Sequence, residues 1–229
     1  MPENVKRNQA TQGGRGQART RLARRAVVTA ARALFLERGY AATTIDAISN
    51  LSDVPTATVY RLFTSKPGIL RALLGTSIGG DDQPLAVPDR PGVAALFTEP
   101  DPARLLAGFA AITTAINQRS NDVYRVLANA AGSDVAAAEL LTEIQRQRDQ
   151  GQGQIAHALA RNRTLRAGLQ ESDAADLLHA LLSPEVYWLL VIDRHWTPER
   201  YQQWLATTLT QQLLPPSEPH TMPGPRPAG

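Results

Sequence analysis

The residue types that carry most enzyme chemistry are scattered along this sequence. The chain has no cysteine, and its histidines are far apart in the sequence: His157, His179, His195 and His220. Neither a Gly-x-Ser-x-Gly nucleophile elbow nor a Gly-rich phosphate loop is present, and no two histidines have the spacing of metal ligands. We therefore expect no catalytic residue, no metal site and no cofactor, and we do not expect an enzyme.

One short stretch does combine side chains suited to another kind of chemistry. Thr56, Ala57, Thr58 and Arg61 would form the small or polar outer face of a short helix. Arginine can pair with the edge of a guanine, and methyl groups of threonine and alanine can touch those of thymine. Phosphate contacts from flanking positions would then be needed, and the nearby hydroxyl and basic side chains of Thr44, Tyr60 and Lys66 suit them.

The distribution of charge agrees with a polyanionic partner for this part of the chain. Residues 1–75 carry twelve Lys and Arg against four acids, a net charge of +8, although the whole chain carries only +3. The remainder is acidic. A basic first third indicates a module that meets nucleic acid. A basic tail that only keeps the protein in solution explains the charge alone equally well.

The elements around this stretch are predicted to be helices. Apolar residues recur at helical spacing from Val27 to Phe35, and Gly39 suits the end of that helix. Thr43 and Asp46, three residues apart, suggest a weakened capping box before a second, short helix. A tight turn at 52–54 and a helix at 55–63 follow, which is the arrangement of a helix-turn-helix, with Ser65 capping the next helix.

The rest of the chain also reads as helical, so the predicted fold class is all-α. The expected organisation is a disordered basic arm at 1–18, a helix-turn-helix domain at 19–75, a linker or loop at 76–100, a helical domain at 101–214 and a disordered Pro-rich tail at 215–229. The longest apolar run, 186–192, has seven residues, against about 18 for a membrane span. We therefore expect no membrane partner and a cytoplasmic location.

The stretch from Arg24 to Leu74 resembles the DNA-binding domain of TetR-family transcriptional regulators. The resemblance is carried by Ala-Arg-x-Leu-Phe at 31–35, Arg-Gly-Tyr at 38–40, Thr-Thr-Ile at 43–45, Ile48, Thr-Val-Tyr at 58–60, Phe63 and Ser-Lys at 65–66. The family pattern has Ala-Gly where this chain has Ser52-Asp53, and an aromatic residue or His where it has Leu62. Both departures put part of the DNA affinity in doubt.

The resemblance implies roles for individual residues of this domain. It implies base contacts by Thr56, Ala57 and Arg61, and phosphate contacts by Thr44, Thr58, Tyr60 and Lys66. It also implies a homodimer that binds a pseudo-palindromic operator in double-stranded DNA and releases it when a small-molecule effector binds. The identity of the effector, the operator, the target genes and the sign of regulation stay open.

The resemblance further places an effector pocket and a dimer face in the second domain. Candidate pocket residues are Phe109, Ile112, Ile116, Tyr124, Leu127, Ile144, Arg148, Tyr187 and Trp188. A helix over 173–195, apolar on nearly all sides, and a last helix from Pro198 supply the candidate dimer face: Val186, Leu189, Leu190, Tyr201, Trp204, Leu205, Thr208 and Leu209. Ordinary core packing explains each of these residues as well. The alternative function is a TetR-like module for ligand or protein binding in which DNA binding is impaired.

Overall fold

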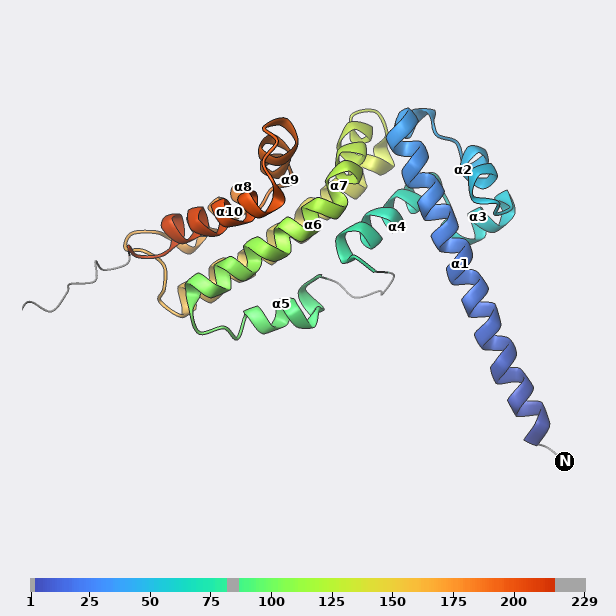
Figure 1. Cartoon of the computed structure of the whole chain (residues 1–229), viewed down its shortest axis with the longest axis horizontal. Coiled ribbons are helices and arrows are strands. Elements are labelled where there is room, and N and C mark those ends of the chain that lie inside the picture. The colour runs from blue at the N-terminus through green and yellow to red at the C-terminus, as the bar shows by residue number, and fades with distance from the viewer. Residues whose placement is uncertain (1–2, 82–86, 217–229) are drawn as a thin grey trace, which may run out of the picture.

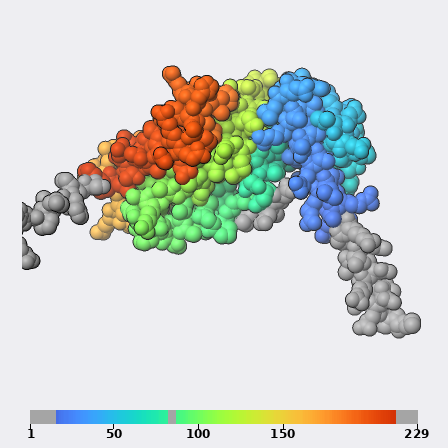
Figure 2. Space-filling view, in the orientation of Figure 1, coloured from blue at the N-terminus to red at the C-terminus, as the bar shows by residue number. Residues whose placement is uncertain are grey.

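The computed structural model describes residues 3–81 and 87–216, and every regular element in these two ranges is a helix. The first four helices form a head at one end of the molecule, and the remaining helices form an elongated body (Figure 1). In the space-filling view, head and body share one continuous surface (Figure 2). Buried apolar side chains form two clusters, one centred on the head and one in the body. The all-α fold class is confirmed.

The head consists of α1 (Glu3–Ala42), α2 (Ile45–Ser52), α3 (Thr56–Phe63) and α4 (Lys66–Gly79). The predicted apolar stripe of α1 is buried in the head's core: Val27, Ala30, Ala31, Leu34 and Phe35. Because α1 begins at Glu3, the segment predicted as a disordered arm is helical from residue 3. Once a helix is packed, each added residue gains a hydrogen bond, and alanine, glutamine and arginine all favour the helical state.

Caps and turns set the angles between these short helices. Gly39 has φ of 80°, and it breaks the helical geometry of α1 before the loop to α2. The N-cap of α2 is Thr44, whose Oγ1 accepts a hydrogen bond from the Ala47 amide at 3.1 Å. The predicted capping box is wrong, because Thr43 is buried and donates its hydroxyl to the Gly39 carbonyl at 2.8 Å. Asp53, with φ of 53°, ends α2 in the left-handed conformation.

Residues 76–100 contain more regular structure than a linker. They include the end of α4, the short 3₁₀ helix η1 (Val87–Asp89) and the helix α5 (Pro91–Leu96). Val93 of α5 is only 6% exposed and packs in the core of the body. Asp101 then caps the next helix, with its carboxylate accepting from the Ala103 amide at 2.9 Å.

The body is built on a long helical pair, α6 (Pro102–Ala131) and α7 (Val135–Arg161), joined by a short loop. Three further helices pack beside it, α8 (Glu171–Leu181), α9 (Pro184–Tyr187) and α10 (Pro198–Leu213), with a π-helical turn, η2 (Trp188–Asp193), after α9. The single helix predicted over 173–195 is wrong. Ser183 caps a new helix that has Pro184 in its first turn, and proline cannot continue α8 because it lacks an amide hydrogen.

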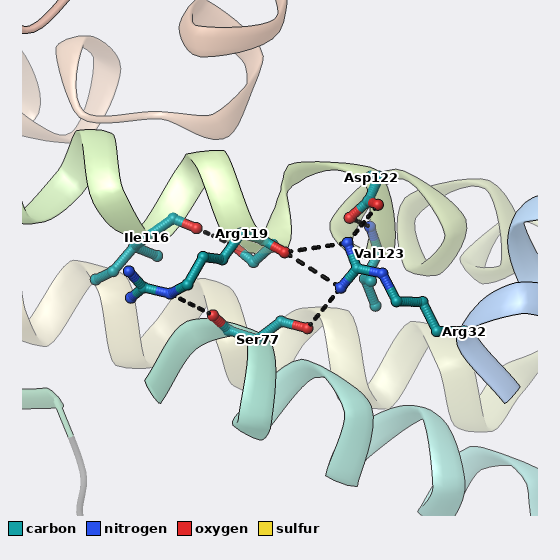
Figure 3. Close-up of polar contacts among 7 residues, drawn as sticks. Arg32, Ser77, Ile116, Arg119, Asp122 and Val123 are labelled. Carbon is teal, nitrogen blue, oxygen red and sulfur yellow. Dashed lines mark hydrogen bonds and ion pairs between the residues drawn. The ribbon is translucent and has the colours of Figure 1, made fainter. Parts of the chain in front are cut away.

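A polar network joins the head to the body where α1, α4 and α6 meet (Figure 3). The guanidinium of Arg32 on α1 forms an ion pair with Asp122 on α6 at 2.6 Å, and it donates to Ser77 on α4 at 3.3 Å. Arg119 on α6 donates to the carbonyls of Ser77 and Ile78 at 3.2 and 3.0 Å. These contacts reach three helices at once, so a shift of α4 relative to α6 would disturb them together.

No single helix in the described ranges is both long and apolar enough to cross a membrane. The bent pair Glu171–Leu181 and Pro184–Asp193 passes such a test on length and composition alone.

Candidate nucleic-acid interface and effector cavity

Helix α3 has one buried face and one open face. Val59 is fully buried and Phe63 is 6% exposed, so both fix the helix to the head. Ala57 and Arg61 are exposed on the other side, and 51% of Tyr60 is exposed. These three predicted contact residues therefore present their side chains to solvent, as a recognition helix requires.

Thr56 and Thr58 are less open than the sequence suggested, because both are half-buried. The Thr56 hydroxyl lies 3.1 Å from Ser49 Oγ and 3.2 Å from Asp46 Oδ1, so it is engaged within the head. Ser49 in turn donates to the Val54 carbonyl at 2.7 Å, which holds the turn between α2 and α3. Any base contact by Thr56 would use its methyl group.

The predicted phosphate residues divide into free and engaged groups. Thr44 is exposed, and as an N-cap it accepts a hydrogen bond, which leaves its hydroxyl hydrogen for another acceptor. Lys66 is half-buried, and its Nζ donates to the carbonyls of Tyr40 at 2.9 Å and Thr43 at 3.1 Å. The ammonium also lies 4.2 Å from the centre of the Tyr40 ring. Burial lowers the pKa of Lys66, and the charge of Asp134 acts against that shift.

Arg24 is a residue of this region whose role the sequence did not reveal. Its guanidinium donates to the Leu62 carbonyl at 3.0 Å and lies 4.6 Å from the centre of the Phe63 ring. It thereby ties α1 to the last turn of α3. Leu62 itself is half-buried and packs against the head's core, so its side chain supports α3. The sequence did offer one signal for Arg24, which is a basic residue placed just before the apolar stripe of α1.

A cavity of about 610 Å³ lies in the body between α4, α5, α6 and α7. This volume is within the usual range of small-molecule sites, roughly 300–1,000 Å³. Five of the predicted pocket residues line it: Phe109, Ile116, Tyr124, Ile144 and Arg148. Contributions from α4, including Leu74 and Ile78, and from Asn117 and Glu143 were not anticipated.

Four predicted pocket residues do not line this cavity. Leu127 is fully buried in the head-centred cluster, and Tyr187 packs edge-on against Tyr201 at 5.0 Å. Ile112 packs against the core of the body instead. The guanidinium of Arg125 covers the ring of Trp188, with its central carbon 3.5 Å from the centre of that ring. Ile112 and Leu127 lie on α6, which lines the cavity through other residues, whereas Trp188 lies on η2, which contributes none.

The predicted dimer face also needs correction. Tyr201, Leu205 and Leu209 have no exposed surface, because α10 buries them in the body's own core. They cannot contact a partner. Leu189 is 56% exposed, and Ile192, which was not named, is 41% exposed. Val186, Leu190, Trp204 and Thr208 are half-buried and stay candidates.

Comparisons with known proteins identify the head and the fold. Residues 27–73 match the family model of bacterial regulatory proteins, tetR family. No curated protein matches the chain significantly. The fold as a whole is similar to that of a putative TetR-family regulator from Syntrophomonas wolfei, with a TM-score of 0.64 and 18% identity over 82% of this chain and 93% of that one.

Two further solved structures agree with that assignment. NalD, the secondary repressor of the MexAB-OprM multidrug efflux pump in Pseudomonas aeruginosa, gives a TM-score of 0.65 at 20% identity over 85% of this chain and 98% of that one. SmeT in its complex with triclosan gives 0.61 at 18% identity over 90% and 99%. The described chain is thus an all-α protein with an N-terminal helix-turn-helix. Its fold is that of TetR-family transcriptional regulators.

Proposed function

We propose that the protein is a homodimeric, ligand-responsive DNA-binding regulator that acts as a repressor. The observation that carries this proposal is the open face of α3, with Ala57, Tyr60 and Arg61, within a segment that matches the tetR family model. The net charge of +8 over residues 1–75 supports it, because contacts with phosphates supply most of the affinity for DNA. Thr44, Thr58 and Lys66 flank this face, and we assign them phosphate contacts, with Thr56 contributing its methyl group.

A dimer follows from the requirement for two recognition helices on a two-fold operator. Half-sites of such operators lie about 34 Å apart, one turn of DNA. We place the interface on the exposed apolar surface of η2, where Leu189 and Ile192 are exposed beside half-buried Val186 and Leu190. Exposed apolar residues clustered in this way are typical of an interface.

The position of the cavity allows effector binding to affect DNA binding. Helix α4 forms part of its wall with Leu74 and Ile78, and α4 follows α3 directly in the chain. An effector that fits the cavity only when α4 is shifted would favour a different spacing of the two heads, and so release the operator. The complex of SmeT with triclosan, which has a similar fold, supports a small molecule as effector.

Selection of genomic DNA fragments on the purified protein, followed by footprinting, tests this proposal. We expect recovered fragments to share a two-fold site, protected on one face of the duplex over two successive major grooves. Recovery of no two-fold site at moderate salt would contradict it.

The alternative is a TetR-like module for ligand or protein binding with impaired DNA binding. Two acids favour it, because Asp46 and Asp53 are both exposed next to α3. The salt dependence of DNA retention separates the two functions. Binding through phosphates gives a steep fall of affinity with salt, whereas the alternative gives no retention even at low salt.

A further inference from the structure

The cavity in the body is elongated. It is lined along α6 from Phe109 to Tyr124 and along α7 from Glu143 to Ile155. Fifteen residues of helix correspond to about 22 Å. A volume of about 610 Å³ spread over that length makes a narrow channel that suits an extended molecule.

The two ends of the channel differ in polarity. Since α6 and α7 run antiparallel, Tyr124 lies at the same end as Glu143, and Phe109 lies at the same end as Ile155. Arg148 lies about a turn and a half along α7 from Glu143, toward the middle of the channel. Phe97 packs edge-on against Phe109 at 5.3 Å and adds to the apolar lining of the far end. The channel therefore has a charged end and an end lined by apolar and uncharged polar side chains.

The charged end carries one positive charge without a partner. Arg71 and Glu143 neutralise each other in an ion pair of 2.6 Å. Arg148 has no carboxylate within ion-pair distance among the described residues, and its polar contact is a long one, 3.5 Å to the His179 carbonyl. Burial raises the pKa of Tyr124, and the Glu185 carboxylate, which accepts a hydrogen bond from the Tyr124 hydroxyl at 3.2 Å, raises it further, against the charge of Arg148. The charge of Arg148 also acts against the effect of burial on the pKa of Tyr201.

A buried polar pair lies beside this charge. Asn117 lines the channel about two turns of α6 from Tyr124, and it is only 4% exposed. Its amide faces the hydroxyl of Tyr201 and acts against the effect of burial on the pKa of that phenol. Asn117 and Tyr201 therefore satisfy each other, and Arg148 is the polar group of this part of the channel that is left for a ligand.

We propose that the channel binds an amphipathic organic anion, with its carboxylate at Arg148 and its apolar chain directed toward Phe109. The inference rests on the effector site of the proposed function and assigns the chemical class of its ligand. An amphipathic cation fits less well, because Arg148 would repel it. Among the residues that line the cavity, the one acid is Glu143, which is paired with Arg71, and Glu185, outside the lining, accepts a hydrogen bond from Tyr124.

Calorimetric titration of the full chain with four probes tests the chemical class. Dodecanoate, below the concentration at which it forms micelles, supplies both the carboxylate and the alkyl chain of the proposed ligand. Acetate supplies only the carboxylate, and dodecanol supplies only the alkyl chain. Dodecyltrimethylammonium carries the same chain with the opposite charge. We expect dodecanoate to bind at least tenfold more tightly than each of the other three. Equal binding of the cation, the alcohol or acetate would overturn the proposal.

A matched pair of variants tests the position of the ligand's carboxylate. Arg148→Gln should weaken dodecanoate binding about tenfold to a hundredfold and leave dodecanol unchanged, since one charge-assisted contact is removed. Arg146→Gln, an exposed arginine on the same helix that does not line the channel, should have no effect. An equal response of the two variants would overturn the assignment.

The DNA-binding proposal is judged separately, by operator binding of the parent and Arg146→Gln proteins without any probe. Operator binding should be equal in these two proteins. Absence of operator binding together with normal dodecanoate binding would overturn the regulator proposal alone, and the reverse result would overturn this inference alone.

Discussion

Lys66 illustrates how a single side chain can serve both structure and recognition. Two of its three donors hold the carbonyls of Tyr40 and Thr43, at the junction of α1 and α2. The third donor is the one that a phosphate would use. The sequence suggested the contact with phosphate, whereas the two carbonyl contacts depend on the way in which α4 meets the α1–α2 loop.

Substitution Lys66→Met should therefore have two effects. The free energy of unfolding should fall by roughly 1–3 kcal/mol, because two carbonyls lose a charged donor. The slope of log affinity for DNA against log salt should become shallower by about one, because one phosphate contact is lost. Urea denaturation and salt titration measure the two effects. Unchanged stability would contradict the structural role, and an unchanged slope would contradict the phosphate contact.

Tyr40 should make stability depend on pH in the alkaline range. Burial, with a smaller contribution from the charge of Asp134, raises the pKa of Tyr40 from 10.0 to about 12. The folded protein keeps this proton where the unfolded chain has lost it, so the free energy of unfolding should fall between pH 10 and about 12.

The variant Tyr40→Phe provides the control for that effect. Its fall in stability over the same range should be smaller. At neutral pH it should be at least as stable as the parent, because the Tyr40 hydroxyl is buried without a hydrogen-bond partner. Denaturation curves with the same alkaline dependence in both proteins would contradict this account.

At the scale of elements, the turn between α2 and α3 sets the angle of the recognition helix. Asp53 is the residue that takes the left-handed conformation there, with φ of 53°. Aspartate tolerates this conformation at some cost relative to glycine, and its carboxylate is exposed next to α3.

Two replacements of Asp53 separate the free-energy cost of its left-handed backbone from the effect of its negative charge. Asp53→Gly should raise the free energy of unfolding by up to about 1 kcal/mol, whereas Asp53→Asn should change it little. Both should increase DNA affinity at low salt, because both remove a negative charge near the phosphates. Thermal unfolding and binding titrations measure these effects. Equal DNA affinity in all three proteins would show that Asp53 lies away from the duplex.

The sequence predicted some elements well because local patterns determine them. The stripe from Val27 to Phe35 and the cap at Ser65 depend on neighbouring residues only, and both are as predicted. Periodicity shows which residues of a helix are buried. It does not show whether they pack against the chain's own core or against a partner subunit. Tyr201 and Leu205 were therefore correctly recognised as apolar-face residues and wrongly assigned to a partner. The break at Ser183 was overlooked because the apolar run after it resembled a continuous helix.

The site residues follow the same division. The open face of α3 repeats with helical period, so Ala57 and Arg61 could be placed from sequence. Five residues of the cavity lining were also named in advance, but the contribution of α4 could not be, because it requires knowledge of how α4 packs beside α6 and α7. Asn117 and Glu143 gave no sequence signal that distinguished them from ordinary polar positions on a helix surface.

At the scale of the whole molecule, the proposed dimer depends on the surface of η2. Leu189→Glu should raise the dissociation constant of the dimer at least tenfold, because it places a charge in an apolar interface. Val135→Glu is the matched control, since Val135 is 78% exposed at the start of α7, away from η2. Sedimentation velocity measures both. An equal effect of the two substitutions would contradict this placement of the interface.

The most direct test of recognition by α3 is a specificity profile of Arg61→Ala against the parent protein. Affinity is measured for every single-base-pair variant of the selected operator. The account predicts that the parent discriminates by about 1–3 kcal/mol at one symmetry-related pair of positions and that the variant loses discrimination only there. A variant that binds all sequences more weakly with an unchanged profile would contradict base reading by this helix.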